Sequence, residues 1–414
     1  MQPSGNAPSL QRHPEIMIYF YISSAIFVGG IFIVYWLHNQ YHLDIVVEPT
    51  PPPSSAPLIS VCVPARNEER NIRTCVESIL GQDYPNFEVI VLDDRSTDGT
   101  LKILQDLLME LDSLPSNQKE GAPSIHILHG ADLPRGWAGK PHALSQASAA
   151  ANGDWLCFVD ADTFLSPNTL SACYTKATGT RADMFTIMTF QILGSFWEKV
   201  VMPIVMTALS VGFSPRKVND PDSKDAIANG QFILIRCLVY DAIGGHESVK
   251  DQIVEDKAIA EQVKWNGYRL VVANGYAVAR TRMYTSLSEM WEGWTKNIYL
   301  GLRDRSALML LGVVGAFLAL FAAVILPLWP VLGVFWYLQG GGWLALTVVF
   351  EAIVLWTLVI YMRARVALGM GISPWYAFTL PLGAAVFAAM MITSTWKVLS
   401  GKGVLWKGRR YALK

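Results

Sequence analysis

The chain has 414 residues, of which 52% are hydrophobic and only 16% are charged. That composition is too apolar for an ordinary soluble protein of this length, so part of the chain is expected to lie in a bilayer. The formal net charge of -1 argues against nucleic acid as a partner. The five cysteines are scattered without CxxC spacing, and the seven histidines show no metal-ligand spacing. Any metal is therefore expected to be held by carboxylates.

The N-terminal segment, residues 1–48, contains an apolar stretch at 16–37 without a charged residue. This stretch is long enough to cross the ~30 Å hydrocarbon core as a helix, and we predict a transmembrane helix there. A signal peptide is the alternative, but no basic leader of the usual kind precedes the stretch and no small-residue cleavage site follows it. Residues 49–57 are rich in proline, which predicts a semi-rigid linker and a domain boundary.

From residue 58 onward, short apolar runs alternate with helical patterns. The pattern predicts strands at 58–63, 87–92, 125–128 and 155–159, and helices at 68–80, 100–111 and 140–151. This rhythm is typical of an α/β domain with a mostly parallel, helix-covered sheet, which we expect over residues 58–305. Residues 196–213 are apolar but interrupted by charges and a proline, which favours an interfacial helix, with core packing as the alternative.

The last third of the chain is predicted to be a transmembrane region at 306–396 followed by a basic tail at 397–414. Its apolar stretches at 307–336, 343–361 and 375–393 can each reach across a bilayer, and basic residues flank them. Basic flanks favour the cytoplasm. Three simple crossings after a cytoplasmic domain would leave the tail outside, so one proline-containing stretch is expected to be broken or re-entrant, and the number of crossings stays open.

Two polar clusters follow the first two predicted strands. Pro64, Arg66 and Glu68 lie where the first strand ends, and Asp93 and Asp94 lie where the second ends. Carboxylates at these positions can accept hydrogen bonds from ribose hydroxyls or from a base. Either cluster alone is weak evidence, because Asp, Asn and Gly also form turns.

Two acidic pairs complete the pattern. Asp160 and Asp162 follow a predicted strand, which is a usual way to hold Mg²⁺ or Mn²⁺ together with a diphosphate. A helix cap is the alternative interpretation of this pair. Glu255 and Asp256 open a predicted helix, where a favourable interaction with the helix dipole is the alternative. Because ligands bind beyond the carboxyl ends of parallel strands, all four clusters are expected in one crevice.

In order and spacing, these clusters resemble family 2 glycosyltransferases of the A fold over roughly residues 58–297. The resemblance implies a nucleotide-sugar donor, Mg²⁺ or Mn²⁺ as cofactor, and Asp256 as the catalytic base. The implied metal ligands are Asp160 and Asp162. The expected donor-side residues are Pro64, Arg66, Glu68, Asp93, Asp94, Lys140, Asp160 and Arg409.

Finer features resemble the hopene-associated and carotenoid-type membrane glycosyltransferases, namely the segments 133–144, 244–246, 291–297 and 406–411. Lys140 is expected to offset phosphate charge, with a surface lysine as the alternative. Arg409 either folds back on the diphosphate or anchors the tail at the interface. The expected acceptor-side residues are Gly230, Gln231, Glu255 and Trp294, although turn formation explains the glycine and glutamine nearly as well.

The resulting hypothesis is inverting, metal-dependent transfer of a sugar, with a UDP-sugar as donor, to a hydroxyl of a membrane lipid or isoprenoid at the cytoplasmic face. The Gln-x-x-Arg-Trp motif of processive synthases is absent and 291–297 stands in its place, so one sugar per acceptor is expected. The alternatives are a polyprenyl-phosphate sugar synthase, a non-catalytic scaffold and a transporter. Against transport, most predicted spans lack ionisable residues, Glu351 being the exception.

Overall fold

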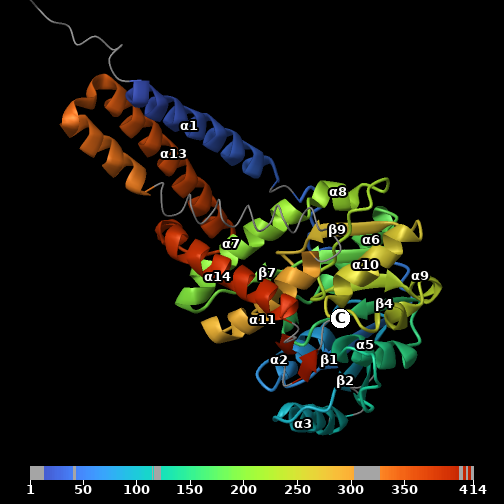
Figure 1. Ribbon diagram of the computed structural model, residues 1–414. Coiled ribbons are helices and arrows are strands. Elements are labelled where there is room, and N and C mark those ends of the chain that lie inside the picture. Colours follow the sequence, from blue (N-terminus) through green and yellow to red (C-terminus); the bar gives the residue numbers. More distant parts are fainter. Residues whose placement is uncertain are drawn as a thin grey trace, which may run out of the picture. The chain divides into compact units, whose positions relative to one another are not determined.

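The computed structural model describes residues 14–40, 43–113, 115, 123–302, 327–400, 404–406 and 409–411. The chain divides into two compact units. The first, here called the membrane unit, consists of Met1–Tyr41, Lys199–Val205 and Leu311–Ala389. The second, here called the sheet unit, consists of His42–Glu198, Met206–Leu310 and Met390–Lys414. Figure 1 shows the elements of both.

The sheet unit is built on a seven-stranded sheet in the order β3-β2-β1-β4-β8-β6-β9. All neighbouring strands pair in parallel except β8, which runs antiparallel to both β4 and β6. The strands are β1 (Ile59–Ala65), β2 (Phe87–Asp93), β3 (Ser124–His129), β4 (Trp155–Phe158), β6 (Met184–Met188), β8 (Ile233–Arg236) and β9 (Leu270–Asn274). The predicted α/β fold with a mostly parallel sheet is confirmed.

A smaller sheet in the order β5-β10-β7 lies in the same unit, and β11 pairs with β12. Their bounds are β5 (Thr163–Leu165), β7 (Phe190–Gln191), β10 (Ala279–Thr281), β11 (Val404–Trp406) and β12 (Arg409–Tyr411). The helices of this unit are α2 (Ile72–Leu80), α3 (Thr100–Asp112), α5 (Gly139–Ala149), α6 (Thr169–Gly179), α8 (Pro215–Asn219), α9 (Cys237–Ala242), η2 (Gly245–Val249), α10 (Glu255–Trp265) and α11 (Leu287–Leu302).

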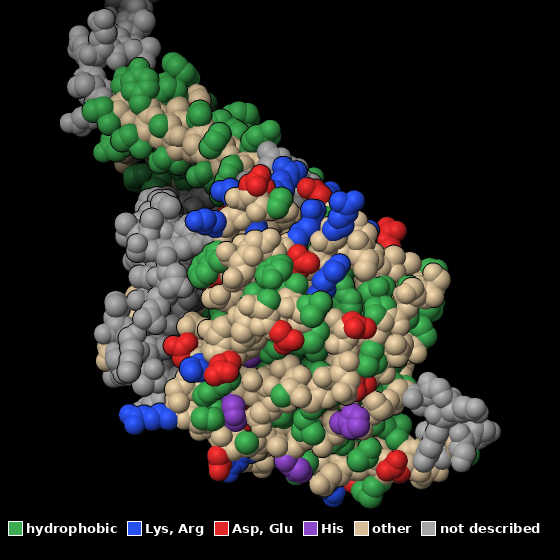
Figure 2. Space-filling view, turned by 90° about the vertical axis from the view of Figure 1, so that its right-hand side faces the viewer, with side chains coloured by type: hydrophobic (Ala, Val, Ile, Leu, Met, Phe, Trp, Pro, Cys, Tyr) green, Lys and Arg blue, Asp and Glu red, His purple; other side chains and the backbone are tan. Residues whose placement is uncertain are grey.

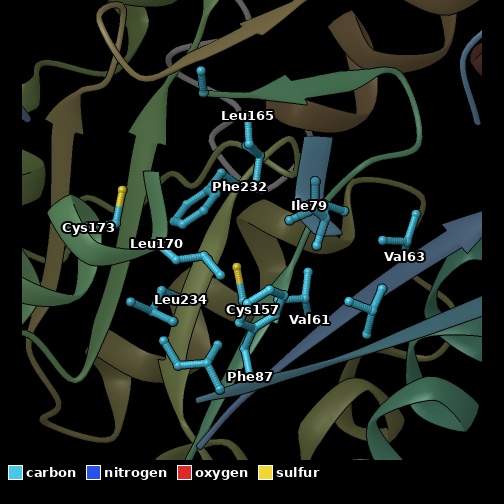
Figure 3. Close-up of a cluster of buried hydrophobic side chains, with 14 of the residues drawn as sticks. Val61, Val63, Ile79, Phe87, Cys157, Leu165, Leu170, Cys173, Phe232 and Leu234 are labelled. Carbon is cyan, nitrogen blue, oxygen red and sulfur yellow. The ribbon is translucent and has the colours of Figure 1, made fainter. Parts of the chain in front are cut away.

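The core of the sheet unit has two hydrophobic clusters because strand side chains alternate between the two faces. Val61 and Val63 of β1 belong to one cluster, whereas Cys62 between them belongs to the other. Figure 3 shows part of the first cluster, where Val61, Cys157 and Leu234 lie together. Since both faces are buried, β1 and β2 are apolar almost throughout, as parallel strands require.

In the membrane unit, the described residues include helical stretches long and apolar enough to cross a bilayer: Met17–Trp36, Pro327–Gly369 and Pro374–Lys397. The second is not one continuous helix, because Gly340 has a φ of 91° and Gly342 a φ of 58°. A Cβ on Gly333 would lie 2.7 Å from Val349 Cγ2, so residues 327–336 double back along α13 (Gly342–Gly369). Residues 307–326 of the predicted first stretch lie outside the described part of the chain.

The third stretch begins as a 3₁₀ turn, η4 (Pro374–Thr379), and continues as α14 (Leu380–Leu399). Of the two proline-containing stretches, either of which was a candidate for a broken or re-entrant segment, this one carries Pro381. Pro381 stands in the first turn of α14, where a missing N–H is tolerated.

Helix α1 (Pro14–Gln40) lies beside α13 within the membrane unit (Figure 1). Glu351 of α13 is only 8% exposed and accepts hydrogen bonds from Ser23 Oγ at 2.9 Å and Ser24 Oγ at 2.7 Å. A Cβ on Gly30 would lie 2.7 Å from a methyl group of Leu355, so the two helices approach closely. Hydrophobic side chains cover the helical part at the top of Figure 2.

Helix α7 (Phe196–Gly212) covers the segment predicted as an interfacial helix. A reciprocal capping box between Ser195 and Glu198 begins it. Pro203 has no N–H for the carbonyl of Lys199, which would otherwise be its helical acceptor. In the membrane unit, Arg363 Nη2 donates to this carbonyl at 3.2 Å and to that of Val200 at 3.3 Å. The arginine thus compensates for the interrupted hydrogen-bond ladder.

Candidate active site

A cavity of the sheet unit lies at the carboxyl ends of β1 and β4. Pro64 of β1 and Asp160, just after β4, contribute to its wall, together with the segment before β8 and the start of α10. Its polar lining residues are Lys140, Asp160, Gly230, His246, Glu255 and Asp256. Residues of three of the four predicted clusters therefore meet here, whereas Asp93 and Asp94 of the second cluster are not among the lining residues.

Lys140 is the central cation of this cavity. Its Nζ lies 2.7 Å from Asp160 Oδ1 and 2.7 Å from Glu255 Oε1. Burial alone would lower the pKa of Lys140, but the charges of Asp160, Glu255 and Asp256 outweigh burial and raise it well above its usual value. Lys140 therefore stays charged and holds two carboxylates from different elements together.

The neighbouring acids Glu255 and Asp256 differ in their electrostatics. Burial would raise the pKa of Glu255, but the ion pair with Lys140 outweighs burial and lowers it. Burial and the negative charge of Glu255 raise the pKa of Asp256 to about 6. Asp256 Oδ2 accepts from Gly230 N at 3.1 Å and Oδ1 accepts from Lys257 N at 2.7 Å. Of the two, Asp256 has the properties of a general base near neutral pH.

Gly230 lies close to the charged end of Lys140. A Cβ there would lie 2.9 Å from Lys140 Nζ, 3.3 Å from Asp256 Oδ2 and 3.4 Å from Asp160 Oδ2. A side chain would therefore displace the lysine from between the carboxylates. The backbone of the segment before β8 is part of the site.

Asp160 and Asp162 flank the turn between β4 and β5, where Thr163 N donates to the carbonyl of Asp160 at 3.0 Å. In the described ranges, no cluster of three or more His, Cys, Asp or Glu side chains forms a complete metal cage. Two carboxylates nevertheless fit Mg²⁺ or Mn²⁺, because such ions take few protein oxygens and complete their coordination from phosphate and water. The donor set is hard, which fits these ions better than zinc.

On the predicted donor side, the loops after β1 and β2 are fastened together. Arg66 Nη1 donates to the carbonyls of Asp94 at 2.5 Å and Arg95 at 3.2 Å. Glu68 N donates to Thr100 Oγ1 at 2.8 Å. Asp93 is buried, and its Oδ1 has no hydrogen-bond partner among the described residues. A buried acceptor without a donor is unusual and is consistent with a ligand group at this loop pair.

On the predicted acceptor side, Gln231 is buried and its Oε1 accepts from Thr189 Oγ1, from Gln191 Nε2 at 3.3 Å and from Asn229 Nδ2 at 3.1 Å. These bonds fix the orientation of the carboxamide. Trp294 of α11 is 6% exposed, and within the described ranges its Nε1 has no hydrogen-bond partner.

Lys296 was not among the predicted site residues. Its charge contributes to the lowered pKa of Glu255, so α11 brings a second cation near the acidic pair. The sequence analysis had selected Trp294 from the segment 291–297, whereas the structure adds Lys296 of the same helix. Arg409 lies in β12, of which the structure describes the backbone alone, so its predicted contact with a diphosphate lies outside the described side chains.

The chain is similar to known glycosyltransferases. Residues 60–244 match the model of glycosyl transferase family 2. A 4,4'-diaponeurosporenoate glycosyltransferase of Staphylococcus aureus strain MRSA252 is 28% identical over 359 residues, which cover 86% of this chain and 88% of that protein. The protein of the same description from strain USA300 is 27% identical with the same coverage.

Among solved structures, the mannosyltransferase PcManGT from Pyrobaculum calidifontis, in complex with GDP-Man and Mn²⁺, superimposes with a TM-score of 0.50. It is 16% identical, and the match covers 93% of this chain and 99% of that one. At this identity the likeness concerns the fold, which is that of an A-type glycosyltransferase.

Proposed function

We propose that this chain is a glycosyltransferase that uses a nucleotide-sugar, because residues 60–244 match the model of glycosyl transferase family 2 and its relatives are named as glycosyltransferases. It transfers one sugar, with inversion, from a UDP-sugar to a hydroxyl of a membrane lipid or isoprenoid. The observation that carries the proposal is the pair of neighbouring acids in one cavity. Glu255 is held as an anion by Lys140, whereas Asp256 has a pKa raised to about 6 and is not ion-paired to that lysine.

Asp256 takes the proton of the acceptor hydroxyl while the oxygen of that hydroxyl attacks the anomeric carbon. The bond from that carbon to the nucleoside diphosphate breaks, and the diphosphate leaves with the electron pair. Lys140 offers positive charge beside the departing group. Asp160 and Asp162 would hold a divalent ion, which when bound neutralises charge on the diphosphate. No covalent intermediate with the protein is required.

The proposed acceptor rests on two observations. The relatives are named for a diaponeurosporenoate, which supports an isoprenoid acceptor, and the match covers most of both chains. That name is of a carboxylate, so the hydroxyl is proposed from the raised pKa of Asp256 and not from the relatives. The described residues also include helices able to cross a bilayer, which would hold the reaction at a membrane. The Mn²⁺ in the PcManGT complex supports a divalent ion.

We also propose that the chain is organised as an N-terminal segment at 1–48, a linker at 49–57, a catalytic domain at 58–305, a transmembrane region at 306–396 and a basic tail at 397–414.

The deciding experiment incubates membranes containing the protein with labelled nucleotide-sugars and identifies the labelled lipid by mass spectrometry. We expect a neutral glycolipid or an isoprenoid glycoside, formed only when the protein is present. A product whose sugar is released by mild acid would instead identify a polyprenyl-phosphate sugar synthase. Nucleoside diphosphate release that does not depend on added lipid would disprove the proposed acceptor class.

We also propose that the sheet unit faces the cytoplasm, where nucleotide-sugars are made. Ser54 is exposed in the proline-rich linker, so a Ser54→Cys protein reports its side of the membrane. Cys237 is the half-buried native cysteine and is replaced by serine in the background. An impermeant thiol reagent should label Ser54→Cys only after the cells are opened. Efficient labelling of intact cells would contradict the orientation.

A further inference from the structure

The motif Gly244-Gly245-His246 has no part in the mechanism above. Gly244 has a φ of 79° and Gly245 a φ of 52°, both in the left-handed region that glycine adopts readily. A Cβ on Gly245 would lie 2.7 Å from Cε1 of Tyr240. The two glycines therefore turn the chain tightly against the tyrosine ring, and this turn places His246.

The imidazole of His246 is held on two sides. Its ring packs edge-to-face on Phe158 with centroids 4.9 Å apart, and the side chain is 3% exposed. Nδ1 lies 2.8 Å from Tyr240 Oη, and the backbone N–H of His246 donates to the same oxygen at 3.1 Å. The ring orientation is thus fixed by the tyrosine hydroxyl.

The same hydroxyl also determines which ring nitrogen carries the proton. Ser148 Oγ donates to the carbonyl of Ser145 at 3.0 Å and lies 3.0 Å from Tyr240 Oη. If Ser148 Oγ–H donates to the carbonyl of Ser145, Tyr240 Oη–H donates to Ser148 Oγ, and Tyr240 Oη accepts from Nδ1–H of His246. In the opposite arrangement Tyr240 Oη–H donates to Nδ1 and Ser148 Oγ–H donates to Tyr240 Oη, so the hydrogen bond to Ser145 is lost. The arrangement with more hydrogen bonds therefore protonates Nδ1 and leaves a lone pair on Nε2.

Nε2 is the ring nitrogen left to face the cavity, because Nδ1 is turned to Tyr240. His246 lines the same cavity as Lys140, Asp160, Glu255 and Asp256. Across the described ranges, no hydrogen-bond partner of Nε2 is found. Burial lowers the pKa of His246 to about 4, so the ring stays neutral at physiological pH.

We propose that His246 Nε2 accepts a hydrogen bond from a hydroxyl group of a bound reactant, which makes His246 a binding and specificity residue of this site. The inference rests on the proposed function, because that function supplies the reactants. The hydroxyl belongs either to the sugar of the donor or to the acceptor. A neutral nitrogen acceptor suits a hydroxyl, whereas it offers nothing to a phosphate or a carboxylate.

The first test replaces His246 with Phe, which keeps a flat ring against Phe158 but removes both nitrogens. We expect the KM of one reactant to rise about three- to tenfold, the usual effect of losing one neutral hydrogen bond. A changed donor KM identifies the sugar hydroxyl, and a changed acceptor KM identifies the acceptor. His246→Gln, whose carboxamide oxygen reaches towards the Nε2 position, should recover part of the loss. A folded His246→Phe protein with unchanged KM values for both reactants would overturn the proposal.

A second test does not depend on turnover. In the full-length protein labelled with ¹⁵N-histidine, the signals missing from the His246→Phe protein belong to His246. We expect a protonated Nδ1 and an unprotonated Nε2, and we expect the Nε2 signal to shift when a nucleotide-sugar or the acceptor is added. A protonated Nε2 with unprotonated Nδ1, or a signal unchanged by both reactants, would refute the inference. If the wild-type protein transfers no sugar, the proposed function fails, and the Nε2 signal still decides the role of His246.

Discussion

Replacing Asp256 with Asn is the sharpest test of the proposed base. Both carboxylate oxygens accept from backbone N–H groups, Oδ1 from Lys257 and Oδ2 from Gly230. Asparagine has one oxygen, so its NH₂ must face one of these N–H donors. The shorter bond, 2.7 Å to Lys257, is the one expected to remain, and the bond to Gly230 is lost. The N–H of Gly230 and the NH₂ of the new asparagine are then both without an acceptor. Their loss costs roughly 1–3 kcal/mol of stability, which a folded domain of this size tolerates.

The effect on the reaction is expected to be larger. General-base catalysis typically contributes roughly 10²–10⁴-fold, so the barrier to transfer should rise by about 3–5 kcal/mol. Donor affinity should change little, because the lost group is a proton acceptor and not an ion-pair partner of Lys140. Asp251→Asn is the matched control, since Asp251 is exposed and precedes the same helix.

The assay measures initial rates of sugar transfer at saturating donor, and separately the dissociation constant of the nucleotide. If the Asp256→Asn protein retains near-normal transfer while Glu255→Gln is inactive, the base is Glu255. If the Asn protein also loses nucleotide binding, Asp256 belongs to the donor site and the mechanism is wrong. A thermal melt of each variant separates these outcomes from unfolding.

Chelation of divalent ions should abolish transfer, as should Asp162→Ala in a folded protein, and full turnover in excess chelator would exclude the metal assignment. Because the deprotonated form of Asp256 is the base, transfer should be lost as the pH falls through about 6, and a rate that is level down to pH values near 4 would contradict this assignment. Gly230→Ala should reduce transfer at least about tenfold by displacing Lys140, because the new Cβ would lie 2.9 Å from Nζ. The control is Gly179→Ala, whose new Cβ has nothing within 4 Å and which should transfer sugar at the wild-type rate. Equal transfer rates in the two variants would show that the close approach to Lys140 does not matter.

The sequence was informative where a chemical group follows directly from strand order. Pro64 and Asp160 could be assigned to one crevice because the parallel strands β1 and β4 deliver their carboxyl ends to one edge of the sheet. Asp256 follows the antiparallel strand β8, so this rule does not explain its place in the cavity. The bridging position of Lys140 could not be read from sequence, because it depends on how α5 packs against β1 and β2. Lys296 was missed for a similar reason. The register of α11 determines which of its residues lies near the acidic pair, and a local sequence pattern does not show that register.

Other features were hidden because they depend on packing between distant segments. The antiparallel direction of β8 leaves no trace in a short apolar run. By contrast, the reversal at Gly340–Gly342 falls between the predicted apolar stretches 307–336 and 343–361. His246 was noted only as part of a resemblance, since its function depends on the hydroxyl of Tyr240 and on the face of Phe158, which no spacing rule identifies.

The hydrogen bonds from Ser23 and Ser24 to Glu351 have a consequence for biosynthesis. Glu351 lies 328 residues after Ser23 and 327 after Ser24, and almost the whole sheet unit is encoded between them. At ribosomal rates of roughly 5–20 residues per second, α1 waits on the order of 20–60 s before its partner helix is made. The seven-stranded sheet has time to fold during this interval. A nascent chain stalled before Glu351 therefore carries that sheet in folded form while the serines of α1 still lack their carboxylate, which is the state that membrane quality control would meet.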